Sequence, residues 1–99
     1  MENTRYTQNE KEFQFSQIIT KHFYHNYTTE KKKDVISACY RFFNKWNKKG
    51  YVVDEEYLVL YAFSIWEKCK ESGNSFNTQT LYQRLNVETG LFVKKDFVL

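Results

Sequence analysis

The chain of 99 residues contains no proline, three glycines and two alanines. Proline breaks the interior of a helix and glycine weakens it, so their scarcity permits long helices. Three scattered glycines cannot form the glycine-rich loop that cradles a phosphate, and the sequence has no GxSxG or HExxH motif. We therefore expect a protein that is not an enzyme.

Cysteine and histidine are also scarce. Cys39 and Cys69 do not form a CxxC pair, and each stands among apolar neighbours, which predicts buried free thiols. His22 and His25 lie three residues apart, but no further ligand accompanies them at the spacing typical of a metal site. We expect neither a metal ion nor any other cofactor.

Long apolar runs are absent, which predicts no membrane contact, since a membrane-spanning helix needs about 18 or more apolar residues. The first ten residues are polar and include two glutamates, unlike a signal peptide, so we expect a cytoplasmic protein. The length suits one domain over residues 1–99, with residues 1–8 flexible.

Four segments carry the start signals of helices. The expected N-caps are Asn9 (with Glu12 completing a capping box), Thr28 or Thr29, Asp54, and Ser75 or Asn77. Gly50, Gly73 and Gly90 are expected near helix ends.

Apolar spacing gives the arrangement of these segments. The second segment has one apolar stripe with a helical period, and the third is apolar on nearly all sides between Tyr57 and Trp66. Residues 51–53 are expected to be extended, and the tail could form two short strands or one strand paired with residues 51–53. We predict an all-α fold, a compact bundle of about four helices with the third at its centre and a short extended C-terminal tail.

In contrast, the chain is rich in aromatic residues: it contains 19, more than a small core requires. Seven have helical spacing and are expected in the core: Phe15, Phe23, Phe42, Phe43, Trp46, Phe63 and Trp66. The tyrosines left over are expected near the surface: Tyr24, Tyr27, Tyr40, Tyr51 and Tyr82. Aromatic rings that gather at a surface are typical of binding sites.

Charge is unevenly distributed. The net charge is +3, yet residues 31–49 alone hold seven basic residues against the single acid Asp34. Such a stretch is either a solvated helix face or a surface for an anionic partner. The candidate binding residues are Lys31, Lys32, Lys33, Arg41, Lys45, Lys48 and Lys49, with Tyr24, Tyr27 and Tyr40 beside them.

These features favour a small non-catalytic binding protein. We expect it to regulate or inhibit a larger protein, one that handles nucleic acid, through the basic and aromatic surface. Two alternatives are direct binding of nucleic acid by residues 29–49 and a structural protein that forms homodimers. The abundance of Lys, Asn, Tyr and Phe is associated with AT-rich genomes and so with accessory proteins of phages or plasmids.

Overall fold

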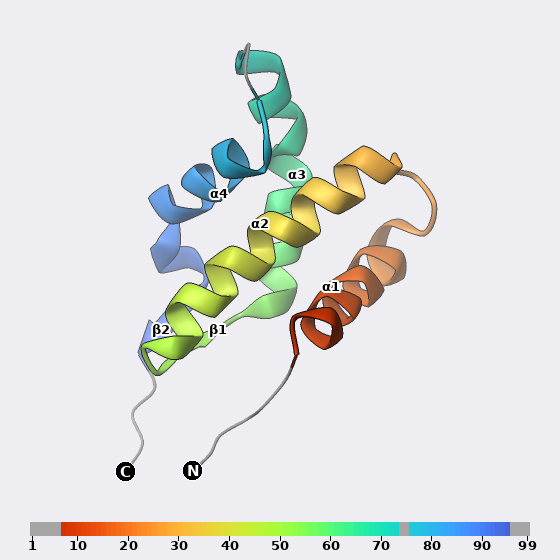
Figure 1. Cartoon of the computed structure of the whole chain (residues 1–99). Helices are drawn as coiled ribbons and strands as arrows, with labels where there is room; N and C mark the ends of the chain where they lie inside the picture. Colours follow the sequence, from red (N-terminus) through yellow and green to blue (C-terminus); the bar gives the residue numbers. More distant parts are fainter. Residues whose placement is uncertain (1–6, 74–75, 96–99) are drawn as a thin grey trace.

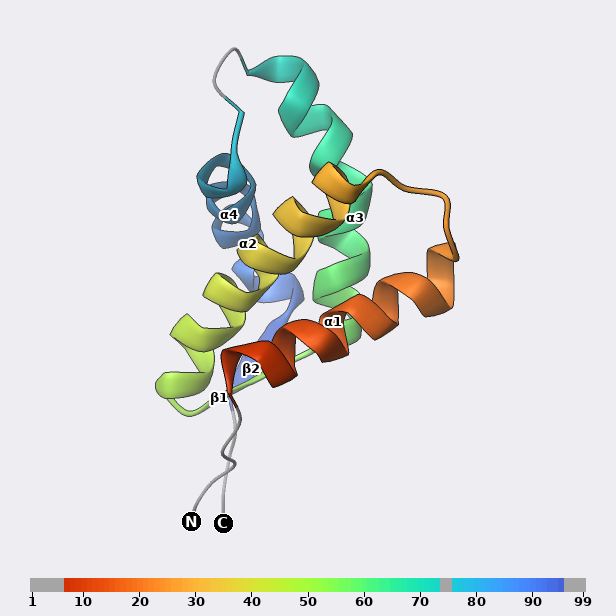
Figure 2. The same cartoon turned by 45° about the vertical axis from the view of Figure 1, so that its right-hand side comes forward.

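Four α-helices and one pair of short strands make up the computed structural model, which describes residues 7–73 and 76–95. The elements are α1 (Gln8–Phe23), α2 (Thr29–Lys48), β1 (Tyr51–Val53), α3 (Glu55–Ser72), α4 (Thr78–Val87), the 3-10 turn η1 (Thr89–Leu91) and β2 (Val93–Lys95). The predicted all-α fold is confirmed. Figure 1 shows α1 and α4 on opposite sides of α2, and Figure 2 shows the same arrangement from a second side.

The first helix begins earlier than expected. Thr7, not Asn9, is its N-cap: the Thr7 hydroxyl accepts a hydrogen bond from the Glu10 N–H, and the Glu10 carboxylate accepts one from the Thr7 N–H. Both Thr7-x-x-Glu10 and Asn9-x-x-Glu12 satisfy the sequence pattern of a capping box, and the former forms. Within the range expected to be flexible, residues 7 and 8 belong to this cap and helix, and residues 1–6 lie outside the described part.

The other caps follow the sequence signals. Thr28, Asp54 and Asn77 each accept a hydrogen bond from a backbone N–H three residues on, so the predicted starts of α2, α3 and α4 are confirmed. Gly50 follows α2 with a φ of +87°, in the left-handed region that glycine adopts at lowest cost.

The extended segment after α2 pairs with the tail. β1 and β2 are antiparallel, with Val53 opposite Val93 and Tyr51 opposite Lys95. Just before β2, Phe92 is fully buried, and its carbonyl accepts a hydrogen bond of 2.7 Å from the Asp54 N–H. Of the two arrangements left open for the tail, the pairing with residues 51–53 is the one formed; residues 97–99 lie outside the described part.

The core lies between α2 and α3, and each contacts α1 and α4. The predicted centre was α3, but α2 shares that position because it also packs against β1. Leu81 and Leu85 are the fully buried residues that α4 contributes. The other fully buried apolar side chains are Phe15, Ile19, Val35, Ala38, Cys39, Phe42, Leu58, Val59, Ala62 and Phe92.

Candidate functional site

The basic residues of α2 separate into three environments. Lys31 lies against α3, with its Nζ 4.0 Å from the centre of the Phe63 ring and 3.8 Å from a carboxylate oxygen of Glu67. Only 13% of its side chain is exposed. Ring and carboxylate both stabilise the ammonium there, so Lys31 serves the packing of α2 on α3.

Lys32 and Lys33 face the opposite neighbour, α1. They line a groove of about 490 Å³ together with Phe13 of α1 and Ile36 of α2. We call this the α1–α2 groove; its remaining lining residues are Asn9, Glu12, Thr29 and Ser37. Phe13 is 63% exposed, so the groove combines an open aromatic ring with two cations.

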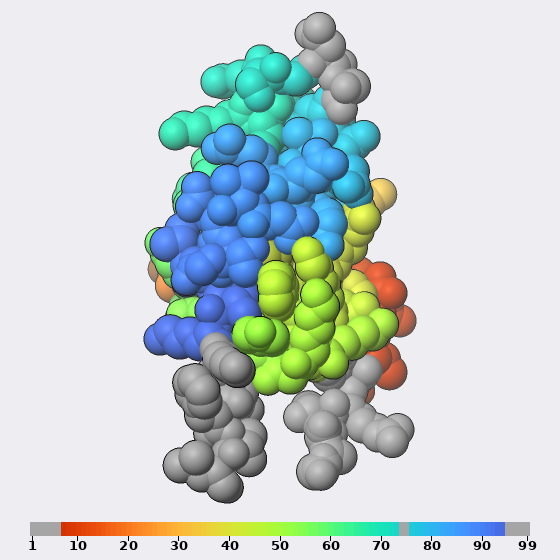
Figure 3. Space-filling view, turned by 90° about the vertical axis from the view of Figure 1, so that its left-hand side faces the viewer, coloured from red at the N-terminus to blue at the C-terminus, as the bar shows by residue number. Residues whose placement is uncertain are grey.

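The four remaining cations are Arg41, Lys45 and Lys48 in the second half of α2 and Lys49 at its C-cap. Spacings of four and three residues place the first three on a single helix face. We call all four the basic row. The sequence contains no acidic residue between Asp34 and Asp54. In Figure 3 this half of α2 lies beside α4 on one face of the molecule.

Aromatic rings contact three of the four cations of the basic row. The Arg41 guanidinium lies 4.5 Å from the centre of the Tyr82 ring on α4. The ammonium groups of Lys45 and Lys49 lie 5.2 and 4.9 Å from the centre of the Trp46 ring. These cation–π contacts hold the charges in place. They also occupy the faces on which an unpaired base would stack.

The three candidate tyrosines do not join the basic row. Tyr27 packs edge-on against Phe63, and Tyr40 is half-buried against the core. Tyr24 is 68% exposed, but it caps the C-terminus of α1. Tyr27 stands just before the start of α2. Lys45 lies sixteen residues farther along that helix, a distance of about 24 Å. The structure therefore separates Tyr27 from the cations of the basic row and turns Tyr40 toward the core.

Phe13 is a candidate binding residue that the sequence analysis missed. The sequence does indicate one exposed ring here, because Phe13 and Phe15 are two residues apart and residues two apart in a helix cannot both face the core. Phe15 is fully buried and Phe13 is not. Of the aromatic residues expected in the core, Phe23 and Trp46 are only partly buried.

The thiols and histidines show no catalytic arrangement. Cys39 and Cys69 are free and buried, and burial raises the pKa of each thiol. Such thiols remain protonated and unreactive at neutral pH. His22 bonds to Glu56 of α3, and within the described ranges no three His, Cys, Asp or Glu side chains group as metal ligands do.

Searches of protein-family models, curated proteins and solved structures found no match to this chain. Among the described helices, none has the length and apolar character needed to cross a bilayer.

Proposed function

We propose that this protein is a small non-catalytic binding protein that regulates or inhibits a larger protein, and that it docks through the α1–α2 groove. The open ring of Phe13 carries the proposal. Its 63% exposure leaves a large apolar surface in water beside the half-buried Ile36. A protein side chain that fills the groove would remove that surface from water, and a buried aromatic ring is a common energetic centre of protein interfaces.

The charges around the groove indicate what the docking segment carries. Lys32 and Lys33 line the groove against one acid, Glu12. An apolar side chain flanked by carboxylates would therefore complement it, and the lysines would raise the association rate. The basic row lies farther along the same helix, where Arg41 packs on Tyr82 of α4. Its positive charge would attract nucleic acid held by the partner, and this supports a partner that handles nucleic acid.

Site-specific photocrosslinking tests the proposal. A photoreactive phenylalanine analogue replaces Phe13 in one variant and Val87 in a control, since Val87 is a comparably exposed apolar residue on α4. The two variants are irradiated in host extract treated with nuclease. We expect position 13 to crosslink one larger protein, position 87 not to do so, and Lys32→Glu with Lys33→Glu to abolish the crosslink.

Two outcomes would contradict protein docking at the groove. Equal crosslinking from positions 13 and 87 would show that the contact is not specific to the groove. Crosslinks only to a second copy of the chain would favour the structural homodimer instead.

Direct binding of nucleic acid is the second candidate, and the basic row supports it. Three cations on one helix face, followed by Lys49 at the helix end and with no intervening acid, suit the repeated phosphates of a backbone. Because lysines occupy the Trp46 ring, this contact would favour duplex over single strands. Fluorescence anisotropy with a labelled duplex should then give a log–log salt slope of about −3 to −4, as roughly four phosphate contacts require.

Two double variants with the same net charge distinguish nucleic-acid binding at the basic row from general electrostatic attraction. Lys45→Glu with Lys48→Glu removes two cations from the basic row. Lys21→Glu with Lys70→Glu makes the same change in net charge at α1 and α3. Loss of affinity in the first variant alone supports the basic row, whereas equal losses would show that only net charge matters.

A further inference from the structure

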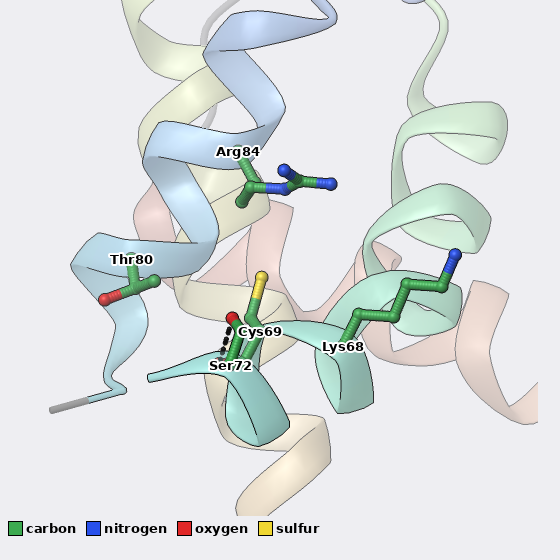
Figure 4. Close-up of a pocket in the computed structure, with 5 residues that line it drawn as sticks. All are labelled: Lys68, Cys69, Ser72, Thr80 and Arg84. Carbon is green, nitrogen blue, oxygen red and sulfur yellow. Dashed lines mark hydrogen bonds between the residues drawn. The ribbon is translucent and has the colours of Figure 1, made fainter. Parts of the chain in front are cut away.

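A hollow of about 190 Å³ lies between the end of α3 and the beginning of α4, apart from both the α1–α2 groove and the basic row. Its lining residues are Lys68, Cys69, Ser72, Thr80 and Arg84. Figure 4 shows Arg84 reaching from α4 past the sulfur of Cys69, and Lys68 extending from α3 toward the same side. We call this the α3–α4 pocket.

Two cations and no carboxylate line the pocket. Within residues 7–73 and 76–95, neither Lys68 nor Arg84 forms an ion pair; this is also true of the basic row, but these two cations differ in lining one hollow. Like charges that face one hollow repel each other, and an anion between them would remove that repulsion. The unmatched charge therefore points to an anionic ligand.

The rest of the lining is polar but uncharged. The Ser72 hydroxyl donates to the carbonyl of Cys69 at 3.3 Å, and the Thr80 hydroxyl donates to Oδ1 of Asn77 at 3.3 Å. Burial raises the pKa of Cys69, so its sulfur stays a neutral thiol. With both hydroxyls donating to protein oxygens, the two cations are the donors left for a ligand.

We propose that the α3–α4 pocket binds one dianionic phosphoryl group, as inorganic phosphate or as a phosphate monoester. The guanidinium of Arg84 can hold two oxygens at once, and Lys68 adds a point charge from the other wall. The volume is below the roughly 300–1,000 Å³ of pockets for larger organic ligands, so it admits the phosphoryl group and little more. This site is independent of the proposed function.

The negative charge of Glu88 opposes the attraction of an anion to the α3–α4 pocket. It stands four residues beyond Arg84, one turn along the chain. Burial and then Glu88 raise the pKa of Tyr61, whereas Arg84 lowers it, so both charges act on the same neighbourhood. Removing the Glu88 carboxylate should make the electrostatic potential around Arg84 more positive and so tighten binding.

Calorimetric or NMR titration at constant ionic strength tests the proposal with three probes: inorganic phosphate, phosphoserine and dimethyl phosphate. We expect saturable binding of a dianion and much weaker binding of dimethyl phosphate, which carries one charge. Phosphate bound without phosphoserine identifies a free-phosphate site, and phosphoserine bound as tightly or more tightly identifies a monoester site. Equal binding of dimethyl phosphate, or no saturation by either dianion, overturns the proposal.

Variants locate the ligand. We expect Arg84→Gln to weaken binding about tenfold or more and Lys68→Gln about fivefold, as the loss of charge-assisted hydrogen bonds implies. Glu88→Gln should strengthen it. Lys70→Gln is the matched control, because it removes the same charge from α3 at a residue paired with Glu30. A loss in Lys70→Gln equal to that in Arg84→Gln would show diffuse attraction and refute the site.

Discussion

The carboxylate of Asp34 accepts a hydrogen bond of 3.0 Å from the indole N–H of Trp66 and so links α2 to α3. Its second oxygen accepts a hydrogen bond of 3.2 Å from the hydroxyl of Thr78, which brings in α4. The single acid of the basic stretch is therefore a junction of three helices.

We predict that Asp34→Ala lowers the free energy of unfolding by about 2 kcal/mol, because it leaves the partly buried Trp66 N–H and Thr78 hydroxyl without their acceptor. Asp34→Asn should lower the free energy of unfolding by less, since an amide oxygen can still accept a hydrogen bond from the indole N–H. Urea unfolding measures both, and Trp66→Phe, alone and combined with Asp34→Ala, completes a double-mutant cycle. A coupling energy near zero would contradict the junction.

A second junction joins the first turns of α1 and α3. The Lys11 Nζ lies 3.0 Å from one carboxylate oxygen of Glu55 and 4.4 Å from the centre of the Phe43 ring. The Lys11 side chain is 9% exposed and that of Glu55 is 30% exposed, so the two partners differ in solvation.

This difference predicts unequal effects of the two truncations. Glu55→Ala should destabilise by about 2 kcal/mol because it removes a carboxylate that pairs with a largely buried ammonium. Lys11→Met should cost about 1 kcal/mol or less, since it keeps the apolar stem and leaves a carboxylate that water can reach. Guanidinium titrations compare the variants; a larger loss for Lys11→Met would refute this account.

Tyr24 holds a backbone conformation that suits glycine. Its φ and ψ are 57° and −112°, and the Phe23 carbonyl accepts a 3.0 Å hydrogen bond from the Asn26 N–H across it. These values define the first central position of a type II′ turn, which a tyrosine occupies only under strain. We predict that Tyr24→Gly raises the free energy of unfolding by about 1 kcal/mol. Tyr24→Ala is the control, since it removes the ring and keeps the strain. If both substitutions stabilise the protein equally in thermal melts, the increase in stability comes from loss of the ring and not from relief of backbone strain.

The sequence predicted most of the fold because its signals were local. The caps at Thr28, Asp54 and Asn77 each depend on residues within one helical turn. The burial of Phe92 depends instead on contacts with Phe42 and Tyr57, far away in the chain. No local pattern in the tail distinguishes that residue from the exposed Leu91.

The candidate site was predictable only in part for the same reason. Spacing alone places Arg41, Lys45 and Lys48 on one face of a helix. The inward position of Lys31 depends on Phe63, 32 residues later in the chain. The charge pattern of the sequence alone therefore did not predict that Lys31 packs inward against α3.

The contact between His22 and Glu56 predicts how stability depends on pH. The hydrogen bond with His22, and then the charge of Lys21, lower the pKa of Glu56 from its usual value of 4.5. A carboxyl whose pKa is lowered by folding stabilises the protein above its unfolded pKa, and this contribution is lost as the pH falls through the folded value.

We therefore expect Glu56→Gln to be less stable than the natural chain near pH ~5.5, where the unfolded carboxyl is already ionised, and the difference to shrink as the pH falls through the lowered pKa of folded Glu56. Chemical unfolding at a series of pH values measures the difference. Glu71→Gln removes an exposed carboxylate from the same helix and serves as the control. A difference between Glu56→Gln and the natural chain that persists undiminished at low pH would show that it does not come from the carboxylate charge.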